Sequence, residues 1–89
     1  MKIKSSKGMV YNAEWMGGPT GIMREVYCEM HDERPISVIA AEFEGAELTE
    51  IERDGAEKTY TGYTELASIG RMDEENLTRI SMRKPQKEA

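Results

Sequence analysis

Cysteine and histidine are nearly missing from this chain of 89 residues, which has one of each. A single cysteine, Cys28, excludes an intramolecular disulfide and a thiolate metal cluster built within one chain. A single histidine, His31, excludes the two-histidine sites that bind zinc or iron, although Asp32 and Glu33 follow it directly. We therefore predict no catalytic residue, no cofactor, no metal site and no enzymatic activity, and we expect Cys28 to be a buried core side chain.

Basic residues are also few, because 12 Lys and Arg face 17 Asp and Glu and the formal net charge is −5 at pH 7. Affinity for a phosphate backbone comes from Lys and Arg that displace counterions, so nucleic acid is excluded as a predicted partner. Long apolar runs are missing as well, both after Met1 and elsewhere, which argues against a signal peptide and a membrane span. We expect a soluble protein that is made in a reducing cytoplasm and does not bind membranes.

The length and the 38% hydrophobic content predict one small domain, which we place at residues 1–83. The last segment, "KPQKEA", has no apolar periodicity and contains Pro85. We therefore predict a loose tail over residues 84–89.

The first half of the chain reads as strands. Residues 1–15 predict a short strand, a turn at residues 5–8 and a second strand at residues 9–15, and "MGGPTG" at residues 16–21 predicts a break. Residues 22–30 alternate with period two, which predicts a half-buried strand. Its core face would carry Ile22, Val26, Cys28 and Met30, and its other face Met23, Glu25, Tyr27 and Glu29.

The segment Pro35 to Glu44 predicts the only helix. Pro35 suits a first helical turn, and apolar residues recur at helical spacing up to Phe43. Gly45 stands where a left-handed cap would end the helix. A strand over "ISVIA" is the alternative, but it leaves Phe43 and Gly45 unexplained.

Two hairpins are predicted in the second half. Avoiding like charges across the first one favours a three-residue loop at residues 53–55, which pairs Glu50 with Lys58 and Leu48 with Tyr60. The second hairpin runs over residues 63–72 and 77–83 and pairs Ile69 with Ile80 and Ala67 with Met82. Its loop, "DEEN" at residues 73–76, lacks the spacing of a calcium loop. Together these elements predict an α+β fold, a curved and mainly antiparallel sheet of about five to six strands with one short helix packed on it.

Trp15 and Tyr60 are the candidate interaction residues, because exposed aromatic side chains are enriched in protein interfaces. Trp15 lies beside the glycine-proline segment, and Tyr60 lies in "KTYTGYTELASIG" at residues 58–70. By alternation around a bend at Gly62, we predict that Tyr63, Ala67 and Ile69 face the core. Tyr60 and Leu66 would point away from it.

The order of these segments resembles small proteins encoded by tailed phages and prophages of Gram-positive bacteria. The resemblance rests on structural residues that match across nearly the whole chain: Tyr11, "FEGA" at 43–46, "YTGYT" at 60–64, Leu66, Ile69 and Pro85. It implies a structural or assembly role near the tail or baseplate, with incorporation into a phage particle. The partner would be a phage structural protein or a second copy of the chain.

An alternative function follows from the acidic composition. A chain with net charge −5 could act as a host-directed inhibitor or anti-defence protein that binds a host protein through its carboxylates. The sequence leaves both functions open.

Overall fold

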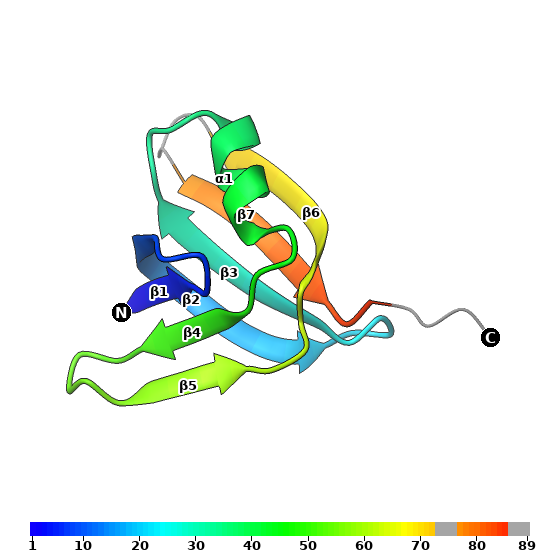
Figure 1. Ribbon diagram of the computed structural model, residues 1–89, viewed down its shortest axis with the longest axis horizontal. Coiled ribbons are helices and arrows are strands. Elements are labelled where there is room, and N and C mark those ends of the chain that lie inside the picture. The colour runs from blue at the N-terminus through cyan, green and yellow to red at the C-terminus, as the bar shows by residue number, and fades with distance from the viewer. Residues whose placement is uncertain (73–76, 86–89) are drawn as a thin grey trace.

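The computed structural model describes residues 1–72 and 77–85 and shows an antiparallel sheet with a short helix (Figure 1). In these residues the chain forms seven strands and one helix, so the predicted α+β class is confirmed, with more strands than the five or six expected. The elements are β1 (Lys2–Ser5), β2 (Val10–Thr20), β3 (Glu25–His31), α1 (Ile36–Phe43), β4 (Leu48–Ile51), β5 (Glu57–Tyr60), β6 (Glu65–Met72) and β7 (Leu77–Arg83). The predicted loop at 73–76 and most of the predicted tail, residues 86–89, lie outside the described residues.

All seven strands belong to one sheet, in the order β5-β4-β1-β2-β3-β7-β6, and all their pairings are antiparallel. β5 and β6 follow each other in the chain but form opposite edges of the sheet. The link between them, residues 61–64, runs past the end of α1, where the Gly45 N–H donates to the Thr64 carbonyl at 2.8 Å (Figure 1). This contact ties the end of the helix to the link between the two edges.

The core lies on the face of the sheet that α1 covers. Alternate residues of β3 and β7 turn to this face, as the period-two pattern predicts. The buried cluster consists of Ile3, Tyr11, Met16, Val26, Cys28, Met30, Ile39, Phe43, Leu48, Tyr60, Ile80 and Met82. Cys28 is fully buried, as predicted, and burial raises the pKa of its thiol.

Helix α1 matches its prediction to within a residue at each end. Pro35 is its N-cap, and the chain leaves the helix through Gly45, whose φ is +80°. The ammonium of Lys7 donates to the carbonyls of Ala41 at 2.8 Å and Glu44 at 2.6 Å, which otherwise lack partners at a helix C-terminus. The turn between β1 and β2 therefore caps the helix.

The β4–β5 hairpin has the predicted register. Leu48 lies opposite Tyr60 and Glu50 opposite Lys58, as charge pairing across the strands required. The hydroxyls of Thr49 and Thr59 lie 3.0 Å apart on the exposed side of this pairing.

The predicted break at residues 16–21 is wrong, because β2 continues through it to Thr20. Its pairing with β3 shifts register twice, between Ala13 and Trp15 and between Gly17 and Thr20, so the strand bends without ending. Gly18 makes this possible. Its φ is +111°, and a Cβ there would lie 2.7 Å from the carbonyl oxygen of Glu25.

The predicted core position of Ile22 is also wrong. Because Thr20 pairs with Glu25, residues 21–24 form the turn of the β2–β3 hairpin, closed by a 3.2 Å hydrogen bond from the Arg24 N–H to the Gly21 carbonyl. Ile22 lies in this turn and is 99% exposed.

The β6–β7 hairpin keeps half of its predicted register. Ile69 pairs with Ile80, but Met82 lies opposite Leu66 and not Ala67. A bulge between Leu66 and Ser68 takes up the extra residue. The prediction that Leu66 points away from the core is therefore wrong, because Leu66 packs against the core cluster.

Candidate functional site

Tyr60, one of the two sequence candidates, is 6% exposed and belongs to the core. Its predicted outward orientation is wrong, because residues directly opposite each other in a hairpin share a face and its partner Leu48 is buried. The predicted register already paired these two residues. The Tyr60 hydroxyl donates to Glu50 Oε1 at 2.9 Å. Burial first, and this hydrogen bond second, raise the pKa of Tyr60 to about 12.

Trp15, the other candidate, lies on the outer face of the sheet, opposite the core, and is 47% exposed. Its indole ring covers Gly17, since a Cβ at Gly17 would lie 2.9 Å from the ring carbon Cζ2. Because Gly17 has no side chain, the ring packs directly against the backbone of the strand. One side of this half-exposed aromatic ring is therefore in contact with the sheet.

Beside Trp15 the outer face is hollowed over β2, β3 and β7, with a cavity volume of about 930 Å³. We call this the outer-face hollow, and it is lined by Glu14, Trp15, Tyr27, Glu29, His31, Leu77 and Arg79. The register explains the grouping. Glu29 lies opposite Trp15 on one side and Arg79 on the other, and His31 lies opposite Leu77.

Two polar pairs lie in the outer-face hollow. His31 Nε2 lies 2.6 Å from Glu14 Oε1, and Arg79 Nη2 lies 3.0 Å from Glu29 Oε2. The Glu14 and Arg79 side chains are about three-fifths exposed, so these pairs are surface contacts of small energetic value. Since Glu29 lies between Trp15 and Arg79 across the strands, the hollow combines apolar and charged side chains, with Glu29 in its middle.

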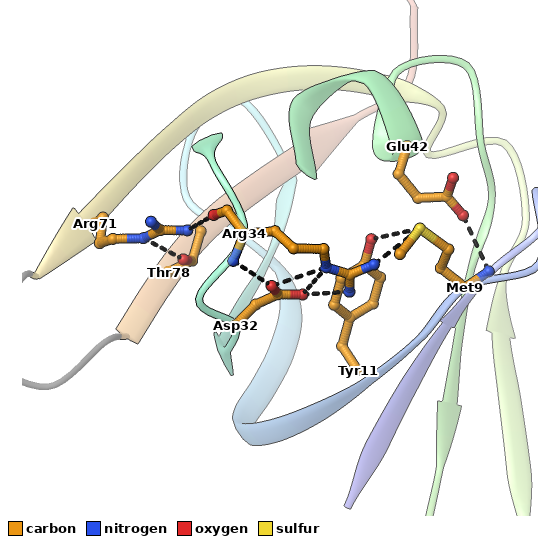
Figure 2. Close-up of polar contacts among 7 residues, drawn as sticks. All are labelled: Met9, Tyr11, Asp32, Arg34, Glu42, Arg71 and Thr78. Carbon is orange, nitrogen blue, oxygen red and sulfur yellow. Dashed lines mark hydrogen bonds and ion pairs between the residues drawn. The ribbon is translucent and has the colours of Figure 1, made fainter. Parts of the chain in front are cut away.

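A second polar cluster lies at the same strand ends but on the core side, around Arg34 (Figure 2). The guanidinium Nε donates to Asp32 Oδ1 at 2.9 Å, and the Arg34 N–H donates to the same oxygen at 2.8 Å. These bonds lower the pKa of Asp32, whose side chain is 6% exposed. The guanidinium also lies 4.9 Å from the centroid of the Tyr11 ring.

The Arg34 cluster ties five parts of the chain together. Arg71 of β6 donates to the Arg34 carbonyl and, at 3.2 Å, to the Thr78 hydroxyl of β7. Glu42 of α1 accepts a 3.0 Å hydrogen bond from the Met9 N–H before β2 (Figure 2). Since Asp32 follows His31 and Thr78 lies between Leu77 and Arg79, the cluster fixes the backbone from which the outer-face hollow is built.

The sequence missed Tyr27, Leu77 and Arg79 as site residues. Alternation did place Tyr27 and Glu29 on the outer face, and that part of the prediction is confirmed by the buried Val26 and Cys28 between them. The pairing of β3 with β7, which brings Leu77 and Arg79 beside them, joins residues about fifty positions apart and has no local signal.

Three further findings bear on the site. Within residues 1–72 and 77–85, no group of three or more His, Cys, Asp or Glu side chains is arranged to hold a metal ion. No helix in the described part of the chain is long and apolar enough to cross a membrane. Comparisons with models of protein families, with curated proteins and with solved structures found no match.

Proposed function

We propose that the protein is a non-catalytic interaction module of the phage or prophage type, with a structural or assembly role in a tail or baseplate, and that it binds a protein partner through the outer-face hollow. The observation that carries this proposal is Trp15, which is held over Gly17 with 47% of its surface exposed. Burying the rest of such a ring is among the largest single contributions to protein binding.

The layout of the hollow supports a protein partner. Trp15, Tyr27 and Leu77 supply apolar contact area, and four polar side chains lie among them: Glu14, Glu29, His31 and Arg79. Aromatic side chains and Arg are enriched in protein interfaces, which also carry direct hydrogen bonds. Because Glu29 and Arg79 are already paired at 3.0 Å within the chain, a partner need not supply a charge opposite either of them.

The phage context rests on the resemblance in sequence and on the kind of surface that the molecule presents. A tail or baseplate component works by binding neighbouring subunits. This chain, described over residues 1–72 and 77–85, offers a rigid sheet whose outer face carries an anchored aromatic side chain. The resemblance and the surface thus support the same role.

The test is to isolate phage particles from the producing host and to search them, and complexes captured with the protein, by mass spectrometry. We expect to find the protein in particles or bound to a tail component. We expect the Trp15→Ala variant to be missing from both. Val38→Ala is the matched control, because Val38 is 44% exposed on α1, away from the hollow. Absence from both the particles and every tail-component complex would rule out the phage role.

The second candidate, an acidic inhibitor of a host protein, is favoured by the net charge of −5. Binding to a basic host protein would weaken as salt screens the charges. Trp15→Ala would leave such binding unchanged, whereas it would abolish binding through the hollow. A salt titration of wild type and variant therefore separates the two functions.

A further inference from the structure

The tip of the β2–β3 hairpin exposes two apolar side chains to solvent. Ile22 is 99% exposed and Met23 is 48% exposed, and they stand next to each other in the turn at residues 21–24. Turns favour Gly, Asn, Asp and Ser, and neither Ile nor Met is among them. We call residues 21–24 the hairpin tip.

We propose that the hairpin tip of one copy enters the outer-face hollow of a second copy, so that the protein assembles head to tail. This inference rests on the proposed function, because it uses the same hollow, and it names the partner there as another copy of the chain.

The tip cannot reach the hollow of its own molecule. Tyr27, the lining residue of β3 nearest to the tip, lies three positions from Arg24, and Glu29 lies five positions from it. At about 3.3 Å per residue, the tip lies about 10 Å from Tyr27 and about 16 Å from Glu29 along the same hairpin. Since the ladder continues from Thr20 and Glu25 down to Asn12 and His31, the tip points away from the hollow and is free to meet another molecule.

The two surfaces match in polarity and charge. Ile22 and Met23 would contact the apolar side chains of the hollow, Trp15, Tyr27 and Leu77. Glu14 is 61% exposed, and its Oε1 lies 2.6 Å from His31 Nε2. Arg24, exposed at the tip, would meet the other carboxylate oxygen of Glu14.

The tip and the hollow are different surfaces of one molecule, so the contact is heterologous. Such contacts close into a ring or continue as a filament, depending on the rotation that each step adds, and the smallest ring is a dimer whose two copies exchange tips. A self-assembling ring or stack would suit a tail or baseplate component.

Sedimentation velocity over a range of protein concentrations tests the proposal. Wild type should form species larger than the monomer as concentration rises. Ile22→Asp should weaken the association at least about tenfold, because a charge replaces the inserted side chain. Val38→Asp, the same change at an exposed position on α1, is the matched control and should associate as wild type does. A wild-type protein that stays monomeric to about 1 mM, or an Ile22→Asp protein that associates normally, overturns the proposal.

A mixing experiment tests the head-to-tail geometry. Ile22→Asp keeps an intact hollow, and Trp15→Ala keeps an intact tip. Each alone should be monomeric, and an equimolar mixture should form a heterodimer that grows no further, because one working contact remains. If Trp15→Ala fails to fold by circular dichroism, Glu14→Lys, at a more exposed position in the hollow, takes its place. A mixture that stays monomeric overturns the proposal. It would indicate an interface in which both copies use the same surface, because mixing the two variants would not restore such an interface.

The outcomes also separate this inference from the proposed function. Assembly that depends on Ile22 and Trp15, in a protein absent from particles and tail complexes, would keep the inference and reject the phage role. A monomeric protein that still binds a tail component through Trp15 would keep the phage role and reject the inference.

Discussion

Gly18 is the position where one methyl group should cost the most stability. Its φ of +111° lies in a region that residues with a Cβ rarely adopt, and strain of this kind costs about 1–3 kcal/mol. An added Cβ would also lie 2.7 Å from the Glu25 carbonyl oxygen and 3.2 Å from Val26 Cα. Both are backbone atoms of the paired strand, so they can move away only by weakening the β2–β3 ladder.

We therefore expect Gly18→Ala to lower the free energy of unfolding by about 2–6 kcal/mol, the strain plus a contact of similar cost. A domain of this length has a total stability of about 4–13 kcal/mol. Since 1 kcal/mol shifts the Tm of a domain of this size by about 4–8 °C, the Tm should fall by at least about 8 °C. Urea and thermal unfolding, followed by circular dichroism, measure both quantities.

Gly17→Ala is the matched control. The three atoms nearest to its added Cβ all belong to the Trp15 ring, the first at 2.9 Å, and this half-exposed side chain can turn aside more easily than the backbone atoms beside Gly18. We expect a loss below about 1 kcal/mol, together with weaker self-association because the indole leaves its place beside the hollow. If Gly18→Ala unfolds within about 1 kcal/mol of wild type, or no more easily than Gly17→Ala, the close approach of β2 to β3 at Gly18 is refuted.

Three further predictions concern titratable groups. Hydrogen bonds from Arg34 lower the pKa of Asp32, so its carboxylate stabilises the fold above its unfolded pKa, and this stabilisation disappears as the pH falls through its folded pKa. Asp32→Asn should therefore cost about 1–3 kcal/mol at neutral pH in urea unfolding, and the cost should shrink as the pH falls below about 4; a cost that does not change with pH would contradict the pairing. The pKa of Tyr60 is raised to about 12, so its contribution to stability is full below pH 10 and is lost as the pH rises towards 12. The pKa values of Tyr11 and Tyr27 are raised as well, so absorbance titration should show more than one late tyrosine, and Tyr60→Phe should remove the step near pH 12. The buried Cys28 thiol should react with a disulfide reagent at least about a thousandfold more slowly than a free thiol, because the reagent reaches it only when the fold opens. Fast labelling of the folded protein would contradict its burial.

Local rules were enough for the elements whose contacts are local in sequence. The β4–β5 register followed from charge pairing around one turn, and α1 followed from apolar spacing between Pro35 and Gly45. The core face of β3 followed from alternation. In each case the residues that decide the structure lie within about ten positions of one another.

The failures have a common physical cause, because in each a contact between strands overrode a signal read along a single strand. The glycines of residues 16–21 look like a break, but they let β2 approach β3 and continue. Alternation counted back from the bend at Gly62 predicts that Tyr60 points outward. Its cross-strand partner Leu48 is in the core, and residues directly opposite share a face, so Tyr60 is in the core as well. The outer-face hollow needs β7 beside β3, which no local pattern indicates.

The position of β7 in the sheet order also determines when this protein can fold. β7 is the last described strand in the chain, yet it lies between β3 and β6 and not at an edge. While the chain is being synthesised, β3 therefore keeps one side unpaired, and β6 has no neighbour, until residues 77–83 have left the ribosome. Folding must be completed after synthesis of this strand, and the nascent chain carries an open, apolar strand edge that a chaperone or a neighbouring nascent chain could bind.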